Sequence, residues 1–338
     1  MITEKERLAA ILEHNNSGRP LCFCPGGMMN MIVTELMQQA GAEWPQAHTD
    51  AKAMSRLAAA SYETGCFENI GVPFCMTVEA EAMGAKVTLG TKQFEPHIER
   101  YVIDSVSQWR QLPCADFHTG RGKVALEALI ELKKKYPHVP IVGNLTGPIS
   151  TAASLMEPTV FYKELRKKKE DAHNFLRFVT KQLISFANLQ IEAGADVIAI
   201  SDPSGTGEIL GPDLFETFTV SYLNELIEHL LPQKMAVIVH ICGQMKSVYK
   251  QVNEIKADIL SFDSIVPMKE ARINLPDRIL MGNVSTYALE FAEPEKIRTI
   301  TRHCAEAGSD ILAPACGLGT KTPLVNIQSM MEELKGFE

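Results

Sequence analysis

Short, nearly continuous runs of apolar residues recur along this chain of 338 residues, and each is bounded by turn-forming or polar residues. Runs of this length without polar alternation are typical of parallel strands that are buried on both faces of a sheet. Eight segments fit this description, namely residues 19–26, 68–74, 140–147, 196–203, 235–243, 258–264, 278–285 and 310–317. The pattern therefore predicts eight buried strands.

Between these runs the apolar positions change to a helical spacing. Residues 124–136, 160–194 and 295–308 are the clearest helix candidates, and residues 1–16 form an amphipathic pattern at the N-terminus. Strands that alternate with helices indicate βα units and a parallel sheet. Eight such units predict an α/β fold, a single (β/α)8 TIM barrel with an N-terminal helical extension.

A doubly wound open sheet is the competing fold. None of the predicted βα units opens with the Gly-rich dinucleotide fingerprint that would favour it. The chain also has no low-complexity segment and no shift in composition that would mark a linker. We therefore predict one domain over residues 1–338.

Composition narrows the function classes. With 46% hydrophobic residues the chain can bury a large core, and its net charge of −8 argues against nucleic-acid binding. Eight cysteines show no framework spacing, and the N-terminus does not read as a signal sequence, so we expect a reducing cytoplasm. The apolar runs are far shorter than the ~20 residues of a membrane-spanning helix, so we expect no membrane segment.

Polar residues gather where the later predicted strands end. In a (β/α)8 barrel the functional groups lie at the carboxyl ends of the strands. The residues at these positions, from the third to the eighth strand, are Asn144, Asp202, His240, Cys242, Asp263, Asn283 and Cys316. This rim is therefore the predicted functional site.

His240 and Cys242 are two residues apart on an extended segment, so their side chains point to the same side. Cys316 can join them through the fold. One imidazole and two thiolates suit Zn²⁺, and three protein ligands leave a fourth position open, as in catalytic zinc sites. The alternative is that the cysteines are small buried apolar residues and that the spacing arose by chance.

The segments HICGQMKSV, ISDPSG and ILAPACGLGTKTPLVNI resemble those of the methylcobamide:coenzyme M methyltransferases, a branch of the uroporphyrinogen decarboxylase superfamily. The likeness extends over nearly the whole chain. It implies a (β/α)8 barrel and a zinc ion held by His240, Cys242 and Cys316. Further similar stretches are EWPQAHTD (43–50), VPFCMTVEAEAMG (72–84), LGTK (89–92) and GNLTGP (143–148).

The resemblance implies transfer of a methyl group from a methyl-Co(III) corrinoid to a thiol such as coenzyme M, with tetrahydrofolate as an alternative acceptor. One barrel leaves no room for a cobalamin domain, so a partner protein would carry the corrinoid and dock over residues 201–212. A decarboxylase is less favoured, because Arg19 stands alone and Cys75 replaces an expected aspartate. A non-catalytic corrinoid-binding barrel is a further alternative.

Five other residues are candidates around the metal. Asp202 would orient His240 or receive the thiol proton, or else cap a helix. Of Glu79 and Glu81, at most one would reach the metal in the absence of thiol, and we select Glu79; the alternative is that both are solvated loop carboxylates. We assign Asn144, Asn283 and Asp263 to corrinoid or thiol contacts, with loop bracing as the alternative for the asparagines.

Overall fold

The computed structural model describes residues 2–15 and 18–337, so Met1 and Asn16, at the ends of the predicted N-terminal helix, lie outside the described residues. Its main sheet has eight parallel strands in the order β1-β10-β9-β8-β7-β6-β5-β2. Their bounds are Leu21–Cys22, Ile70–Val72, Ile141–Thr146, Val197–Ser201, Ala236–Ile241, Ile259–Phe262, Ile279–Met281 and Ile311–Leu312 for β1, β2 and β5 to β10. From β2 and β5 through to β10 each strand of this sheet lies beside the next one along the chain, and β10 pairs with β1, which confirms the predicted barrel-like α/β architecture.

The seam between β1 and β2 departs from a regular ladder. Among the described residues these two strands form the ends of the sheet, and side chains bridge them. The Asn69 amide donates to the Cys24 carbonyl and accepts from its N–H, both at 2.8 Å. The Cys22 N–H donates to the Glu68 carboxylate, and the Glu68 backbone N–H donates to the Cys22 carbonyl. The sheet is thus closed by polar side chains where its strands are shortest.

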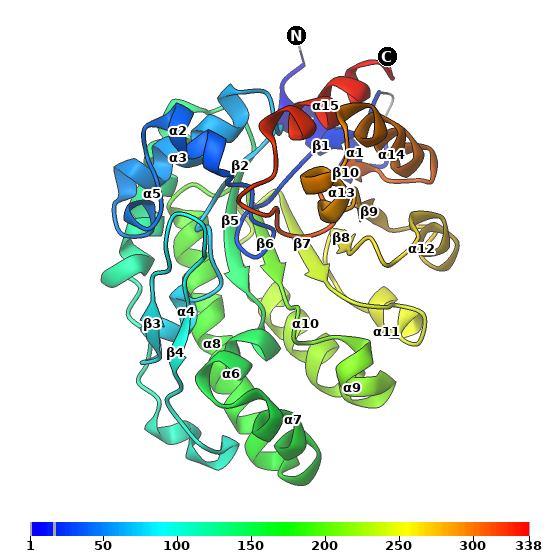
Figure 1. Ribbon diagram of the computed structural model, residues 1–338. Helices are drawn as coiled ribbons and strands as arrows, with labels where there is room; N and C mark the ends of the chain where they lie inside the picture. The colour runs from blue at the N-terminus through cyan, green and yellow to red at the C-terminus, as the bar shows by residue number, and fades with distance from the viewer. Residues whose placement is uncertain (1, 16–17, 338) are drawn as a thin grey trace.

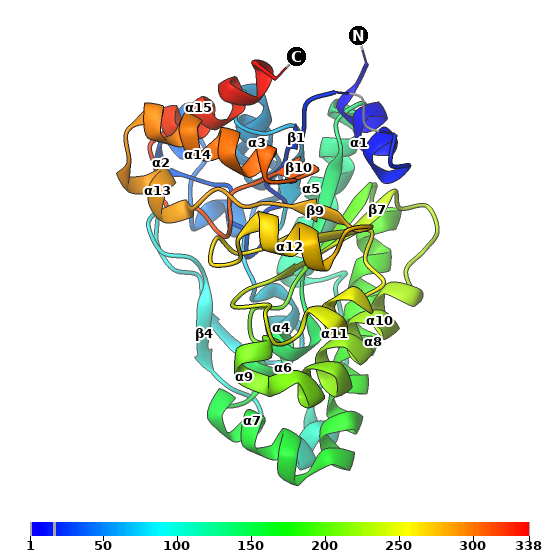
Figure 2. The ribbon, with the colours of Figure 1, turned by 90° about the vertical axis from the view of Figure 1, so that its right-hand side faces the viewer.

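Helices surround the sheet (Figures 1 and 2), and the two termini lie near each other at the end opposite α7. From α1 to α8 the bounds are Glu4–Leu12, Thr34–Ala40, Ala51–Glu63, Val78–Ala82, Gly120–Lys135, Pro148–Leu155, Pro158–Lys167 and Lys169–Glu192. From α9 to α15 they are Gly207–Leu214, Ser221–Glu228, Tyr249–Asn253, Met268–Asn274, Thr286–Phe291, Pro294–Glu306 and Leu324–Lys335. Two 3₁₀ segments (Gln46–His48 and Val106–Gln111) and a π-helical segment (Phe215–Val220) complete the set.

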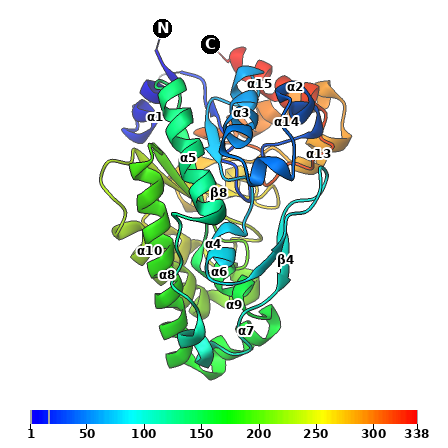
Figure 3. The same cartoon turned by 90° about the vertical axis from the view of Figure 1, so that its left-hand side faces the viewer.

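Two parts of the helix and strand prediction were wrong. The single helix expected over residues 160–194 is two helices, α7 and α8, which meet at Lys168 with φ −127° and ψ 53°. The hairpin of β3 (Lys86–Thr88) and β4 (His97–Arg100) was not predicted, because its strands are short and mostly exposed. Figure 3 shows this hairpin beside α4, on the flank of the barrel.

The barrel interior has its own apolar core. Val142, Ile238 and Ile259 point inward and pack together with Leu8 and Ile11 of α1, which closes the amino-terminal end of the barrel. Successive inward positions along a strand are two residues apart. The next inward positions toward the carboxyl ends are therefore residues 144, 240 and 261, where the apolar core gives way to polar side chains.

One further observation concerns membranes. None of the helices in the described ranges is both long enough and apolar enough to cross a bilayer.

Candidate metal centre

Three sequence-predicted residues converge at the carboxyl end of the barrel. His240 is in β7, Cys242 directly follows that strand, and Cys316 lies in the loop after β10. Their ligand atoms all lie within 4.8 Å of one another, and the His240 Nε2 to Cys242 Sγ distance is 3.4 Å. His240 is buried, whereas both cysteines are partly exposed. The cluster therefore faces the barrel mouth through its sulfur atoms.

Ser261 fixes the orientation of the imidazole. It is the register partner of His240 on the neighbouring strand β8, and its Oγ lies 2.9 Å from His240 Nδ1. The same hydroxyl donates to Met29 Sδ at 3.8 Å, so it can accept the proton that Nδ1 carries. Nε2, which faces Cys242, is then the nitrogen with a free lone pair.

The cluster favours a thiolate. The shared hydrogen bond with Cys242 lowers the pKa of Cys316 to about 5, and the neighbouring His240 and the backbone N–H of Gly317 add to this effect, although burial opposes the shift. The shared hydrogen bond with Cys316 and burial raise the pKa of Cys242 well above its usual range, and the charge of Asp263 adds to this. One sulfur thus holds the proton and the other the negative charge.

These residues fit a zinc ion. Tetrahedral geometry with a Zn–N bond of about 2.0 Å and a Zn–S bond of about 2.3 Å places nitrogen and sulfur roughly 3.5 Å apart. The separation of 3.4 Å between His240 Nε2 and Cys242 Sγ agrees with that value. A soft set of one nitrogen and two sulfurs also suits zinc better than magnesium or calcium.

The loop at residues 25–30 packs against the segment that follows Cys316. A Cβ atom at Gly317 would lie 2.6 Å from the Met28 carbonyl oxygen, so only glycine lets the chain after Cys316 pack this closely. Asn144 holds the other end of the loop, because its Nδ2 donates to the Pro25 carbonyl at 2.8 Å. Asn144 therefore braces this loop, from a position inside β5 rather than after it.

The hydrogen bonds of the Asp202 carboxylate go to the start of α6 and not to His240, the residue it is predicted to orient. Its carboxylate accepts from the backbone N–H groups of Ile149 and Ser150 and from the Ser150 hydroxyl, which lie at the start of α6. Burial raises its pKa to about 6 although these bonds oppose the shift. The helix-capping alternative thus describes its contacts, because three donors already surround its oxygens.

Glu79 is buried rather than solvated. Its oxygens accept from the backbone N–H and the hydroxyl of Thr146, at 2.8 and 3.1 Å, and burial raises its pKa to about 7. Asn283 donates to the Asp263 and Val266 carbonyls, so it braces the loop after β8. Asp263 lies near enough to act on Cys242, but its Oδ1 also accepts from the N–H of Ile265.

Sequence reasoning missed two residues at this site. Ser261 gave no signal, because a serine within an apolar strand acquires its role only through the register with His240. Glu95, in the β3–β4 hairpin, is the other. Burial, followed by interactions with Cys75 and Cys316, raises its pKa to about 8. The Thr320 hydroxyl donates to the Gln93 carbonyl of the same loop at 3.1 Å, so this loop lies beside the segment that follows Cys316.

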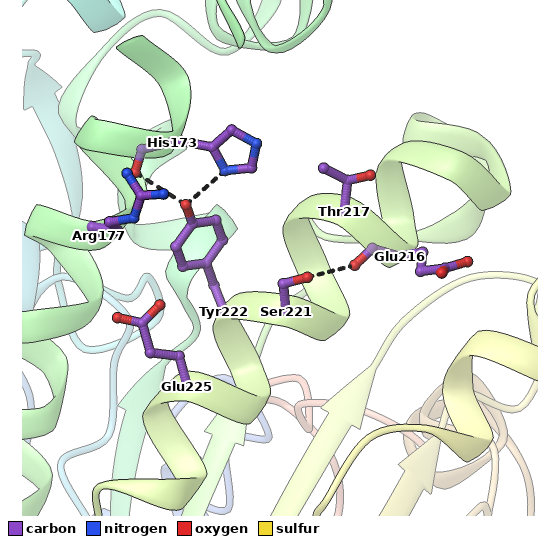
Figure 4. A pocket seen from close by; sticks show the side chains of 7 residues that line it. All are labelled: His173, Arg177, Glu216, Thr217, Ser221, Tyr222 and Glu225. Atoms are coloured by element: carbon purple, nitrogen blue, oxygen red, sulfur yellow. Dashed lines mark hydrogen bonds between the residues drawn. The ribbon is translucent and has the colours of Figure 1, made fainter. Parts of the chain in front are cut away.

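A hollow of about 430 Å³ lies elsewhere, between α8 and the segment from Glu216 to Glu225 (Figure 4). There the Tyr222 hydroxyl donates to the His173 carbonyl and lies 2.8 Å from His173 Nδ1. No cysteine is among its lining residues, and Arg177 lines it together with Glu216 and Glu225. It is separate from the cluster of His240 and the cysteines, which remains the candidate site.

The fold and the site define a class, namely parallel α/β barrels with a cluster of possible metal ligands at the carboxyl ends of the strands. Residues 3–337 match the uroporphyrinogen decarboxylase (URO-D) family, and the chain belongs to that family.

Particular relatives refine this assignment. The methylcobamide:CoM methyltransferase MtaA of Methanosarcina barkeri is 33% identical, over 97% of this chain and 96% of its own length. A solved methyltransferase structure from Methanosarcina mazei has a TM-score of 0.91 and 32% identity, and covers 100% of this chain and 99% of its own. The predicted resemblance to the methyltransferase branch is confirmed.

Decarboxylases of the family match less of the chain. The uroporphyrinogen decarboxylase of Myxococcus xanthus is 30% identical over 70% of this chain and 71% of its own length. The single arginine of the first strand segment, Arg19, pairs with Glu68 at 2.7 Å, at the seam between β1 and β2. The same carboxylate also pairs with Arg7 at 2.6 Å, so Arg19 takes part in an ion-pair network of the barrel seam.

Proposed function

We propose that this protein is a zinc-dependent methyltransferase that moves a methyl group from a methyl-Co(III) corrinoid protein to a thiol acceptor such as coenzyme M. The observation that carries the proposal is the convergence of His240, Cys242 and Cys316 within 4.8 Å at the mouth of the barrel. The full-length likeness to methylcobamide:CoM methyltransferases supports the same reaction.

When bound, zinc would lower the pKa of a coordinated thiol so that the thiolate, the nucleophilic form, is present at neutral pH. The chain supplies the remaining conditions. Ser261 holds the His240 tautomer, and the sulfur atoms face the open mouth. With two cysteine thiolates already present, an added thiolate keeps the site net anionic and the substrate sulfur electron-rich.

The substrate sulfur then attacks the methyl carbon. A carbon–sulfur bond forms, the carbon–cobalt bond breaks, and its electron pair stays on cobalt as Co(I). Positioning by the barrel mouth supplies the in-line approach. The corrinoid would arrive on a partner protein that docks over the rim, including residues 201–212. The names of the relatives lend no support to tetrahydrofolate as the acceptor.

The test is a thiol-dependent assay with the zinc-loaded protein and methylcobalamin. We expect loss of the methyl-cobalt absorbance only when a thiol is present, with the methyl thioether as product. Cys316→Ser should abolish it, and Cys114→Ser, which changes an exposed cysteine outside the cluster, should not. If no thiol accelerates demethylation by the zinc-loaded wild type, the proposed function is wrong.

A further inference from the structure

A buried cation lies beside the barrel mouth. Arg121, the second residue of α5, is only 5% exposed. Its guanidinium donates to Cys75 Sγ at 3.1 Å, to Thr77 Oγ1 at 2.9 Å and to Glu81 Oε2 at 2.6 Å. Cys75 and Thr77 follow β2, so the charge reaches the carboxyl end of the barrel. The Glu81 side chain is 36% exposed, so solvent screens its counter-charge.

Polar atoms without partners lie next to this cation. His48 and Trp44 are each 1% exposed. Within the described part of the chain, both ring nitrogens of His48 and Nε1 of Trp44 lack a hydrogen-bond partner. Their rings are 5.1 Å apart, and the His48 ring is 6.1 Å from Phe74, the residue before Cys75. An unpaired buried polar group costs about 1–3 kcal/mol. The arrangement therefore points to a ligand that supplies polar atoms.

The charge balance favours an anion. Burial, with help from the charge of Arg121, lowers the pKa of His48 to about 3, so its imidazole is neutral and can donate one hydrogen bond. The nearby Glu95 carboxyl, whose pKa burial raises to about 8, is mostly protonated at neutral pH. Arg121 is thus the main buried charge of this group of residues.

The loop at residues 25–30 links this group to the metal cluster. Its Gly27 N–H donates to the Pro73 carbonyl at 3.0 Å, two residues before Cys75, and its Met28 carbonyl packs against Gly317, the residue after Cys316. The Arg121 group and the metal cluster therefore border the same loop at the barrel mouth.

We propose that Arg121, with His48 and Trp44, binds the anionic end of the acceptor thiol while the sulfur occupies the metal cluster. The inference rests on the proposed function, and it narrows the acceptor to short thiols with an anionic tail, such as a sulfonate. Arg121 is then a residue that determines specificity.

The first experiment measures binding without the reaction. Ethanesulfonate carries the anion but no sulfur that can bind the metal as a thiolate, and calorimetry would measure its affinity. We expect the wild type to bind it and Arg121→Met to bind it at least about tenfold more weakly, since a charge-assisted hydrogen bond is lost. Lys123→Met, which removes an exposed cation two residues away, is the matched control.

The second experiment compares 2-mercaptoethanesulfonate with 2-mercaptoethanol as acceptors for methylcobalamin. In Arg121→Met the KM for the anionic thiol should rise at least about tenfold, and the KM for the neutral thiol should change less than about twofold. Should Arg121→Met fail to fold, Trp44→Phe, which removes only the indole N–H, should raise the KM for the anionic thiol alone.

The outcomes separate the two proposals. If both thiols are methylated and Arg121→Met affects them equally, the anion site is wrong and the proposed function stands. If ethanesulfonate binds in an Arg121-dependent way but neither thiol is methylated, the anion site stands and the proposed function fails. Equal binding of ethanesulfonate to wild type and Arg121→Met overturns the inference.

Discussion

The barrel mouth contains two polar regions that look alike in sequence and differ in structure. On the β7 and β10 side, the sulfur atoms of Cys242 and Cys316 and Nε2 of His240 face one another. On the β5 and β6 side, the carboxylates of Glu79 and Asp202 accept hydrogen bonds from Thr146 and from the start of α6. The first region keeps ligand atoms available, and the second uses its oxygens to hold the chain together.

The difference shows that a polar residue at a strand end is not by itself a functional group. What matters is whether backbone donors already occupy its polar atoms. A carboxylate that accepts two or three hydrogen bonds can be displaced by a ligand only at the cost of those bonds. Three predictions test this contrast through the affinity for zinc, and one tests it through the reactivity of Cys316 in the metal-free protein.

The largest effect is expected from Cys316→Ser. It removes the sulfur that is most readily ionised, so zinc affinity, measured by competition with a chromogenic chelator, should fall more than about a hundredfold. Cys304→Ser, at a buried cysteine outside the cluster, is the comparison. Equal affinities in the two variants would show that the cluster does not hold the metal.

Ser261→Ala should have the next largest effect. Without the hydroxyl, His240 Nδ1 loses its partner and the imidazole is free to change tautomer. Groups that orient a metal-binding histidine usually contribute about 10–100-fold in metal affinity. Ser261→Thr, which retains the hydroxyl, should recover most of the loss. A full loss in both variants would point to a packing effect.

The pH dependence of Cys316 gives a third test in the metal-free protein. Its lowered pKa of about 5 means that the thiolate is present above pH 5 and is lost as the pH falls below it. The rate at which iodoacetamide alkylates Cys316, measured by peptide mass spectrometry, should therefore be nearly constant from pH 8 to pH 6. It should fall about tenfold for each pH unit below 5. A rate that still rises steeply from pH 6 to pH 8 would contradict the assigned thiolate.

Asp202→Ala should have the smallest effect on the metal. We expect zinc affinity to stay within about twofold of wild type, while the free energy of unfolding falls by about 1–3 kcal/mol because the start of α6 loses its acceptor. Chemical denaturation would measure the second quantity. A large loss of zinc affinity with unchanged stability would restore Asp202 to the metal site.

Much of this architecture could be predicted from sequence, for physical reasons. Strands buried on both faces require continuous apolar runs, so all eight barrel strands were found. Two ligands on one extended segment must share a side, so the separation of two residues between His240 and Cys242 predicted their convergence. The place of Cys316 in the cluster could be predicted from the position of the preceding strand in the barrel.

The remainder depended on tertiary contacts. Local sequence favours helix through Lys168, and the break accompanies contacts of Glu164, which accepts hydrogen bonds from Ser105 and from the Val106 N–H. The role of Ser261 depends on its register with His240. The bonds of Asp202 to α6 join elements that are about fifty residues apart, which no local pattern reveals.

The central claim is that the open position of a zinc ion at His240, Cys242 and Cys316 receives the substrate sulfur. Zinc-edge X-ray absorption of the zinc-loaded protein, with and without 2-mercaptoethanesulfonate, tests it directly. The account predicts one nitrogen and two sulfur ligands with a light atom in the fourth position, and a third sulfur in place of that atom when the thiol is added. A zinc coordination shell that stays unchanged at saturating thiol would contradict it.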